Sequence, residues 1–330
     1  MSGIYSVARA ARLLFKRLRI GLAFIFITLS STQVYAACTV GGVDYRTNSD
    51  TSGTRITLSD LTAQAGSWNN STDLVMECDV SQFTSMHSAF RGNTAFNQDL
   101  SAWDTSNVTI MYRMFHGATS LLSVTLPQTG NVTNMNEMFA RATNLVSVTL
   151  PDTGNVRTMN KMFQRAASLE IVTLPQTGNV TDMANMFDDA TSLESVTLPT
   201  TDRVTNMGAM FNGATSLTTV SFTNTSAVTS MTFMFYGATA FNQDLSAWDT
   251  SAVTTMAYMF YNATSFAQDI RAWDVDNVSS FRFMFDGANA MIFAYSNTPN
   301  WNTTPTAAWF ALPDTTAPTL TITAAEVNDG

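Results

Sequence analysis

A phenylalanine recurs at nearly constant spacing along the chain, and this period constrains the fold more than any other sequence feature. The intervals are 24 or 25 residues, and the nine positions are Phe90, Phe115, Phe139, Phe163, Phe187, Phe211, Phe235, Phe260 and Phe285. A period of about 20 to 50 residues is typical of repeat proteins, whose units bury their apolar side chains against neighbouring units. We therefore expect a solenoid of nine stacked turns over residues 83–291.

The residues around each phenylalanine form an apolar stripe. In the third copy the stripe is Val132, Met135, Met138, Phe139 and Ala142, at positions 0, 3, 6, 7 and 10. On a helical wheel these positions fall within about 100° of arc, which predicts one short helix per turn. Such a short helix needs packing against neighbouring turns. The repeat methionines are interpreted as core filler rather than as soft metal ligands.

The second half of each central copy has the pattern of a short strand. It reads LLSVTLP from Leu121, and closely similar segments start at Leu145, Leu169 and Leu193. Apolar and hydroxyl residues alternate there with the period of a half-buried strand, and the proline ends it. The predicted class is an α/β repeat solenoid with one short parallel strand and one short helix per turn.

The outer copies carry a second half that is one residue longer, with FNQDLSAWDTSNV from Phe96, FNQDLSAWDTSAV from Phe241 and FAQDIRAWDVDNV from Phe266. With the central consensus LxxVTLPxTxxVTxMxxMFxxAxxL, these segments resemble the BspA-like leucine-rich repeat family of bacterial surface proteins. The resemblance covers residues 83 to about 291 and departs from the usual leucine-rich pattern in its Met-Phe pair. It implies a secreted or surface-attached protein, with some relatives linked to adhesion to host or matrix proteins, and names no ligand.

Residues 1–36 have the composition of a secretory signal peptide. A basic region precedes an apolar stretch at residues 20–29 and a small-residue cleavage site at residues 34–36. The apolar stretch is short for a bilayer span, which disfavours a transmembrane anchor. A lipid-anchored Cys38 is a competing interpretation, disfavoured by the bulky tyrosine three residues before it. We expect a mature chain that starts at Ala37 and is secreted or displayed at the cell surface.

The segments that flank the repeats are predicted to cap the solenoid. Residues 37–82 carry no repeat and form the predicted N-terminal cap, with a disulfide between Cys38 and Cys78, because an even pair of cysteines in an exported protein usually pairs. Residues 292–313 supply large apolar side chains for a C-terminal cap. Residues 314–330 resemble a linker and the first strand of an Ig-like domain. The chain is then either a fragment of a longer protein or ends in an unpaired strand.

The net charge of the chain indicates which classes of partner it can bind. There are 16 basic and 25 acidic residues, and removing the signal peptide takes away five basic ones, which leaves a net charge of −14. The basic footprint of a nucleic-acid-binding protein is therefore absent. Calcium is a candidate ligand, because Asp244 and Asp269, and likewise Asp249 and Asp274, occupy equivalent positions in adjacent turns. The simpler alternative is that each carboxylate accepts backbone hydrogen bonds in its own turn.

The sequence carries no signature of an enzyme. His87 and His116 stand where other copies carry varied residues, and both are interpreted as surface residues. Nucleophile-elbow, zinc-protease, phosphate-loop and dinucleotide-binding motifs are absent. The enzyme alternative is a parallel β-helix polysaccharide lyase, which would have three strands per turn. No cofactor is expected, with calcium as the one alternative.

Two surfaces of the predicted solenoid are candidate binding sites. The strands present one face of mainly hydroxyl side chains, formed by Ser123, Thr125, Ser147, Thr149, Ile171, Thr173, Ser195, Thr197, Thr219 and Ser221. Five residues after the repeat valine, most copies carry polar residues or alanine, but the last three carry Phe233, Tyr258 and Phe283, with Tyr236 and Tyr261 nearby. Contiguous exposed aromatic side chains usually mark a contact surface.

These patterns predict a secreted or cell-surface binding or adhesion module that recognises a protein or a glycan. The following Ig-like domain of the same chain is a third candidate partner for the aromatic residues. The competing interpretation is a passive spacer within a larger surface protein. In that case the rings only pack against each other or against the C-terminal cap.

Overall fold

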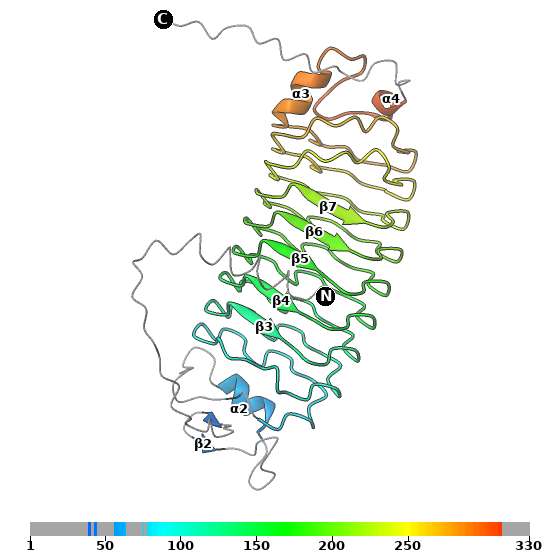
Figure 1. Cartoon of the computed structure of the whole chain (residues 1–330). Coiled ribbons are helices and arrows are strands. Elements are labelled where there is room, and N and C mark those ends of the chain that lie inside the picture. Colours follow the sequence, from blue (N-terminus) through cyan, green and yellow to red (C-terminus); the bar gives the residue numbers. More distant parts are fainter. Residues whose placement is uncertain (1–38, 41–42, 45–55, 64–74, 76–77, 312–330) are drawn as a thin grey trace, which may run out of the picture. The chain divides into compact units, whose positions relative to one another are not determined.

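A computed structural model describes residues 39–40, 43–44, 56–63, 75 and 78–311, and in these the repeats stack turn upon turn (Figure 1). The predicted repeat solenoid is confirmed. The predicted signal peptide, Cys38 and the predicted start of an Ig-like domain lie outside the described residues. Within the described part of the chain, no helix is both long enough and apolar enough to cross a membrane.

The central turns each contribute one short parallel strand, as predicted. The strands are β3 (Ser123–Thr125), β4 (Ser147–Thr149), β5 (Ile171–Thr173), β6 (Ser195–Leu198) and β7 (Thr219–Phe222). β3 pairs with β4, and β6 pairs with both β5 and β7, with equivalent residues of successive turns opposite each other (Figure 1). The outer turns that carry the longer second half form no strand at residues 96–104, 241–249 and 266–274.

A second parallel contact runs along the stack, at the residue just before the first methionine of each apolar stripe, or before Phe281 in the last turn. One bridge residue per turn pairs with its equivalent in the next turn, through Ser85, Ile110, Asn134, Thr158, Asp182, Asn206, Ser230, Thr255 and Ser280. Each central turn therefore has one strand and one bridge. The three strands per turn expected of the parallel β-helix alternative are not found in the described turns.

The prediction of a helix in every turn is wrong, because the residues around each phenylalanine form a chain of tight turns. The backbone is left-handed five and nine residues after the repeat valine, as at Glu137 (φ 52°) and Arg141 (φ 61°). Alternate amides bond in two directions: Met138 N donates to Met135 O at 3.3 Å, whereas Glu137 N donates to Asn160 O of the next turn at 2.9 Å. A helix would pair these amides within one turn, so here the backbone links neighbouring turns instead.

The apolar stripe still faces inward and builds one continuous core. Each repeat phenylalanine is fully buried, and successive rings stack with centroids 5.4 to 5.9 Å apart and planes within 11° of each other. The repeat methionines are fully buried as well, which agrees with their interpretation as core filler. A buried threonine ladder accompanies the rings; Thr177, for example, donates its hydroxyl to the backbone oxygen of Thr200.

Short elements precede the first turn. β1 (Thr39–Val40) and β2 (Val43–Asp44) pair antiparallel, and α2 (Leu58–Ala63) follows. A capping box begins α2, because Thr57 N donates to Asp60 Oδ2 at 2.7 Å and Asp60 N donates to Thr57 Oγ1 at 3.3 Å. Cys78 is buried and disulfide-bonded. Since Cys38 lies outside the described residues, its pairing with Cys78 stays a prediction.

Two helices follow the last turn, and the segment that contains them covers Phe285, the last ring of the ladder. They are α3 (Asn289–Tyr295), which spans the predicted boundary between solenoid and cap, and α4 (Ala307–Phe310). Trp301 stacks on Phe285 at 5.4 Å, and Trp309 meets the same ring edge-on at 5.8 Å. These tryptophans give the last phenylalanine the packing that a further turn would supply.

Candidate functional site

Five aromatic side chains of the last three turns come together on one surface. They line a hollow of about 480 Å³, called the aromatic hollow below, which is formed by Asn212, Phe233, Tyr236, Tyr258, Tyr261, Phe283 and Asp286. Phe233 and Phe283 are each 36% exposed. All five aromatic residues that the sequence singled out therefore lie around the same opening.

The rings of the aromatic hollow form two adjoining rows along the stacking direction. Phe233 and Tyr258 stack with centroids 4.6 Å apart and planes 8° apart, and Tyr236 and Tyr261 stack at 4.8 Å and 4°. Phe283 continues the first row in a tilted contact with Tyr258, at 5.3 Å and 53°. Stacked contacts of this kind fix ring orientation, so the hollow presents preformed ring faces and edges.

The backbone at these rings is left-handed, with φ of 59° at Phe233, 58° at Tyr258 and 52° at Phe283. The equivalent residues in earlier turns are also left-handed, including Asn185 and Ala209. A bulky aromatic residue is poorly suited to this conformation, which asparagine adopts more readily. Asn185 and Ala209 adopt the same left-handed conformation at the equivalent position, so the backbone does not require aromatic residues there.

Polar groups surround the rings. The Arg282 guanidinium lies 5.0 Å from the Phe283 ring centre and 5.9 Å from that of Tyr258. Asn212 Nδ2 donates to Asp188 Oδ1 at 2.7 Å, which holds this amide at the edge of the hollow. Burial raises the pKa of Asp188 above its ordinary value, although its hydrogen bonds from Gln164 and Asn212 act in the opposite direction. Asp286 places a further carboxyl group in the lining.

The predicted hydroxyl face is formed by the strands. Ser123, Thr125, Ser147, Thr149, Ile171, Thr173, Thr197, Thr219 and Ser221 are exposed, and Ser195 is half-buried. Between them the buried valines Val124, Val172, Val196 and Val220 point into the core. The parallel register aligns the hydroxyl groups into rows, as at Thr149 beside Thr125. This surface is regular and polar, and it carries no charged side chain at these strand positions.

Each of the four aspartates predicted as candidate calcium ligands accepts a backbone hydrogen bond within its own turn. In each, Oδ1 accepts the amide of the residue two positions later, at 2.8 Å for Asp244, 3.0 Å for Asp249, 3.0 Å for Asp269 and 3.0 Å for Asp274. Burial acts to raise the pKa of Asp269, but hydrogen bonds from Arg271 outweigh it and lower the pKa. Within the described residues, no group of three or more His, Cys, Asp or Glu side chains is arranged to hold a metal ion.

The two histidines make local contacts. His87 stacks on Tyr112 with ring centroids 5.1 Å apart. His116 Nε2 lies 3.7 Å from Glu137 Oε2, which is held by Arg113 at 2.8 Å. Burial lowers the pKa of His116, which favours the neutral imidazole at pH 7.

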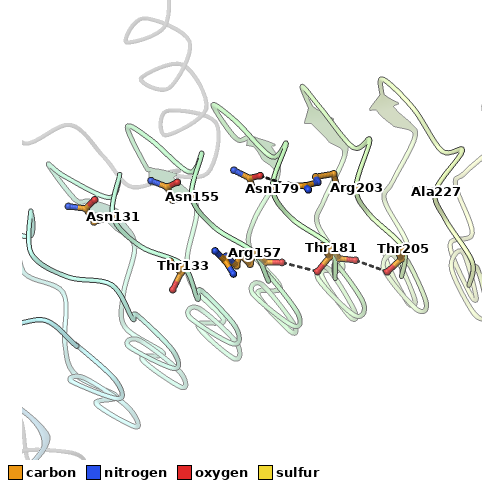
Figure 2. A pocket seen from close by; sticks show the side chains of 9 residues that line it. All are labelled: Asn131, Thr133, Asn155, Arg157, Asn179, Thr181, Arg203, Thr205 and Ala227. Atoms are coloured by element: carbon orange, nitrogen blue, oxygen red, sulfur yellow. Dashed lines mark hydrogen bonds between the residues drawn. The ribbon is translucent and has the colours of Figure 1, made fainter.

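A second hollow lies on another stretch of the turns and was not anticipated from the sequence. This polar groove has a volume of about 940 Å³ and is lined by Asn131, Thr133, Asn155, Arg157, Asn179, Thr181, Arg203, Thr205 and Ala227. Figure 2 shows two rows along the stack, one of asparagines that continues through Arg203 to Ala227 and one of threonines interrupted by Arg157. These residues flank the buried repeat valine on either side.

The two rows are also structural ladders. Asn155 Nδ2 donates to Gly130 O at 2.6 Å, and Thr205 Oγ1 donates to Thr181 O at 3.2 Å, so each side chain ties one turn to the one before. The sequence signal for the groove was the recurrent Asn-Val-Thr. Three lining residues depart from this pattern: Arg157 replaces the threonine, and Arg203 and Ala227 replace the asparagine.

Comparison with known proteins identifies a family without an assigned activity. The family model described as "Mycoplasma protein of unknown function, DUF285" matches three overlapping stretches, residues 56–150, 122–219 and 205–310. These matches cover the solenoid turns together with α2, α3 and α4. No curated protein matches the chain.

Proposed function

The chain belongs to the DUF285 repeat family, and from this premise we propose that it is a binding module of a secreted or cell-surface protein, with the aromatic hollow as its glycan-binding site. The observation that carries the proposal is the pair of stacked, partly exposed ring rows in one hollow. The BspA-like resemblance of the repeats and the signal-peptide composition of residues 1–36 support the surface location.

The chemistry of the hollow favours a sugar over other ligands. A pyranose ring has an apolar C–H face, which packs on an aromatic ring, and a rim of hydroxyl groups, which need hydrogen-bond partners. Tyr236, Tyr258 and Tyr261 offer both surfaces, because each has an apolar ring and a polar hydroxyl. Asn212 and Asp286 add acceptors at the edge. Ligand sites usually combine this kind of apolar lining with a few polar groups.

The matched test replaces the three rings at the left-handed position by asparagine. In the variant Phe233→Asn, Tyr258→Asn, Phe283→Asn, the backbone keeps a residue that suits its conformation, as Asn185 shows. The control variant Lys161→Asn, Ala209→Asn changes the equivalent left-handed position in two turns that carry no aromatic residue at this position. Binding to immobilised neutral oligosaccharides and matrix proteins is measured alongside the melting temperature.

We expect the triple variant to bind oligosaccharides about tenfold more weakly or worse, while its melting temperature stays within a few degrees. The control variant keeps both properties. Retained binding in the triple variant would show that the hollow is not the site. Binding to matrix proteins alone would favour a protein partner, and no binding to either class would favour the spacer. A large loss of stability with intact binding would mean that the rings only pack the surface.

A further inference from the structure

The polar groove concentrates positive charge in an acidic chain. The full sequence has a net charge of −9, yet the lining contains two arginines and no carboxylate. Arg157 and Arg203 lie two turns apart, in different rows of the groove (Figure 2). Both are exposed. Three other arginines, Arg113, Arg165 and Arg271, form ion pairs elsewhere.

The backbone of the ladder does not need either guanidinium. Arg157 N donates to Thr133 O, and Arg157 O accepts from Thr181 N. The backbone hydrogen bonds of the ladder are therefore intact at Arg157, although an arginine replaces the usual threonine there. Within the described residues the Arg157 side chain forms no hydrogen bond or ion pair. Arg203 Nη1 donates to Asn179 Oδ1 at 2.8 Å, which orients its guanidinium along the asparagine row. Its remaining N–H groups are left for a ligand.

The rest of the lining offers hydrogen-bond acceptors along its whole length and one N–H donor at each of two asparagines. Asn131 and Asn155 each use one N–H of Nδ2 in the ladder, which leaves the second N–H and the amide oxygen for a ligand. Thr181 and Thr205 likewise donate their hydroxyl hydrogens to the preceding turn and keep lone pairs. A matching ligand therefore supplies hydroxyl donors along its length and anionic groups for the two guanidiniums. Because the lining comes from five successive turns, the ligand is also extended.

We propose that the polar groove binds a linear acidic polysaccharide, whose carboxylate or sulfate groups pair with Arg157 and Arg203 while its hydroxyl groups donate to the asparagine and threonine rows. Guanidinium groups bind carboxylates and other oxyanions through paired hydrogen bonds. Nucleic acid fits less well, because its backbone offers few hydroxyl donors to the rows of acceptors. The site shares no lining residue with the aromatic hollow, so either proposal can fail without the other.

The test restores the repeat residues. The variant Arg157→Thr, Arg203→Asn returns the ladder to its usual composition and removes two positive charges. The matched control, Arg91→Gln, Arg141→Asn, removes two positive charges at exposed positions that do not line the groove. Binding of the full chain to heparin, hyaluronan, neutral dextran and single-stranded DNA is measured by affinity electrophoresis at low and physiological salt, with melting curves for each variant.

We expect heparin or hyaluronan to retard the unmodified chain, with weaker retardation at higher salt. The groove variant should bind at least about tenfold more weakly, and the control within about twofold. Preference for heparin assigns sulfate as the anionic group, and equal binding of hyaluronan assigns carboxylate. The proposal is overturned if both variants lose binding equally or if the groove variant binds as well as the unmodified chain. It is also overturned if dextran or DNA binds as well as the acidic polysaccharides, or if none of them binds. If the double variant unfolds, the single variant Arg157→Gln decides the question, since within the described part of the chain the Arg157 side chain forms no hydrogen bond or ion pair that the change would remove.

Discussion

Phe187 is the most informative residue for testing how the solenoid is held together. Its ring is fully buried in a central turn, and it stacks on Phe163 at 5.5 Å and on Phe211 at 5.6 Å, with planes within 5° of each other. Phe187→Ala removes both stacked contacts and leaves a cavity between two intact turns. The neighbouring rings are fixed by their own turns, so the cavity cannot close by local collapse.

The expected loss follows from these contacts. Burying a phenylalanine side chain contributes about 1.5 to 3 kcal/mol, and each aromatic contact adds about 0.5 to 1.5 kcal/mol. The total agrees with the roughly 3 to 5 kcal/mol usually lost when a core phenylalanine becomes alanine. Thr191→Ala in the same turn, at an exposed position, should change stability by less than about 0.5 kcal/mol.

Urea unfolding followed by far-UV circular dichroism measures this difference. A fall in the midpoint with an unchanged slope gives the loss in free energy of unfolding directly. A reduced slope would show that the turns on either side of the cavity unfold separately, as repeat proteins do when a contact between neighbours weakens. A loss below about 1 kcal/mol would refute the interpretation of the phenylalanine ladder as the core.

Two further predictions concern other parts of the chain. Burial raises the pKa of Asp188 above 3.8, so ionising this carboxyl group destabilises the folded chain. This cost is absent well below pH 3.8 and is complete once the pH has risen through the folded-state pKa. The melting temperature of Asp188→Asn relative to that of the unmodified chain should therefore increase from acidic pH to pH 7, and a difference that does not change with pH would contradict this. A disulfide between Cys38 and Cys78 predicts no free thiol in the unreduced, denatured chain, and two titratable thiols would exclude the pair. Reducing this bond should lower the free energy of unfolding by up to about 4 kcal/mol, because the bond closes a loop of about 40 residues.

The amino-acid sequence was enough to predict the solenoid, its nine turns and its core-facing residues. Identical apolar residues at a fixed spacing can all be buried only if successive copies stack in register, so the period specifies the architecture. The strands followed from the alternation around residues such as Val124 and Val172. The aromatic residues of the last three turns could also be placed together, because equivalent positions in a stack are neighbours.

Only the tertiary structure decided what the backbone does around each phenylalanine. A stripe at positions 0, 3, 6, 7 and 10 fits a helix, but it fits a succession of three-residue turns equally well, because both return side chains to one face. The choice depends on bonds to the next turn, such as Phe163 N to Met186 O at 2.9 Å, which no local pattern reveals. Arg157 and Arg203 became a candidate site for the same reason: hydrogen bonds between turns fix the threonine and asparagine side chains around them and engage only Nη1 of the Arg203 guanidinium.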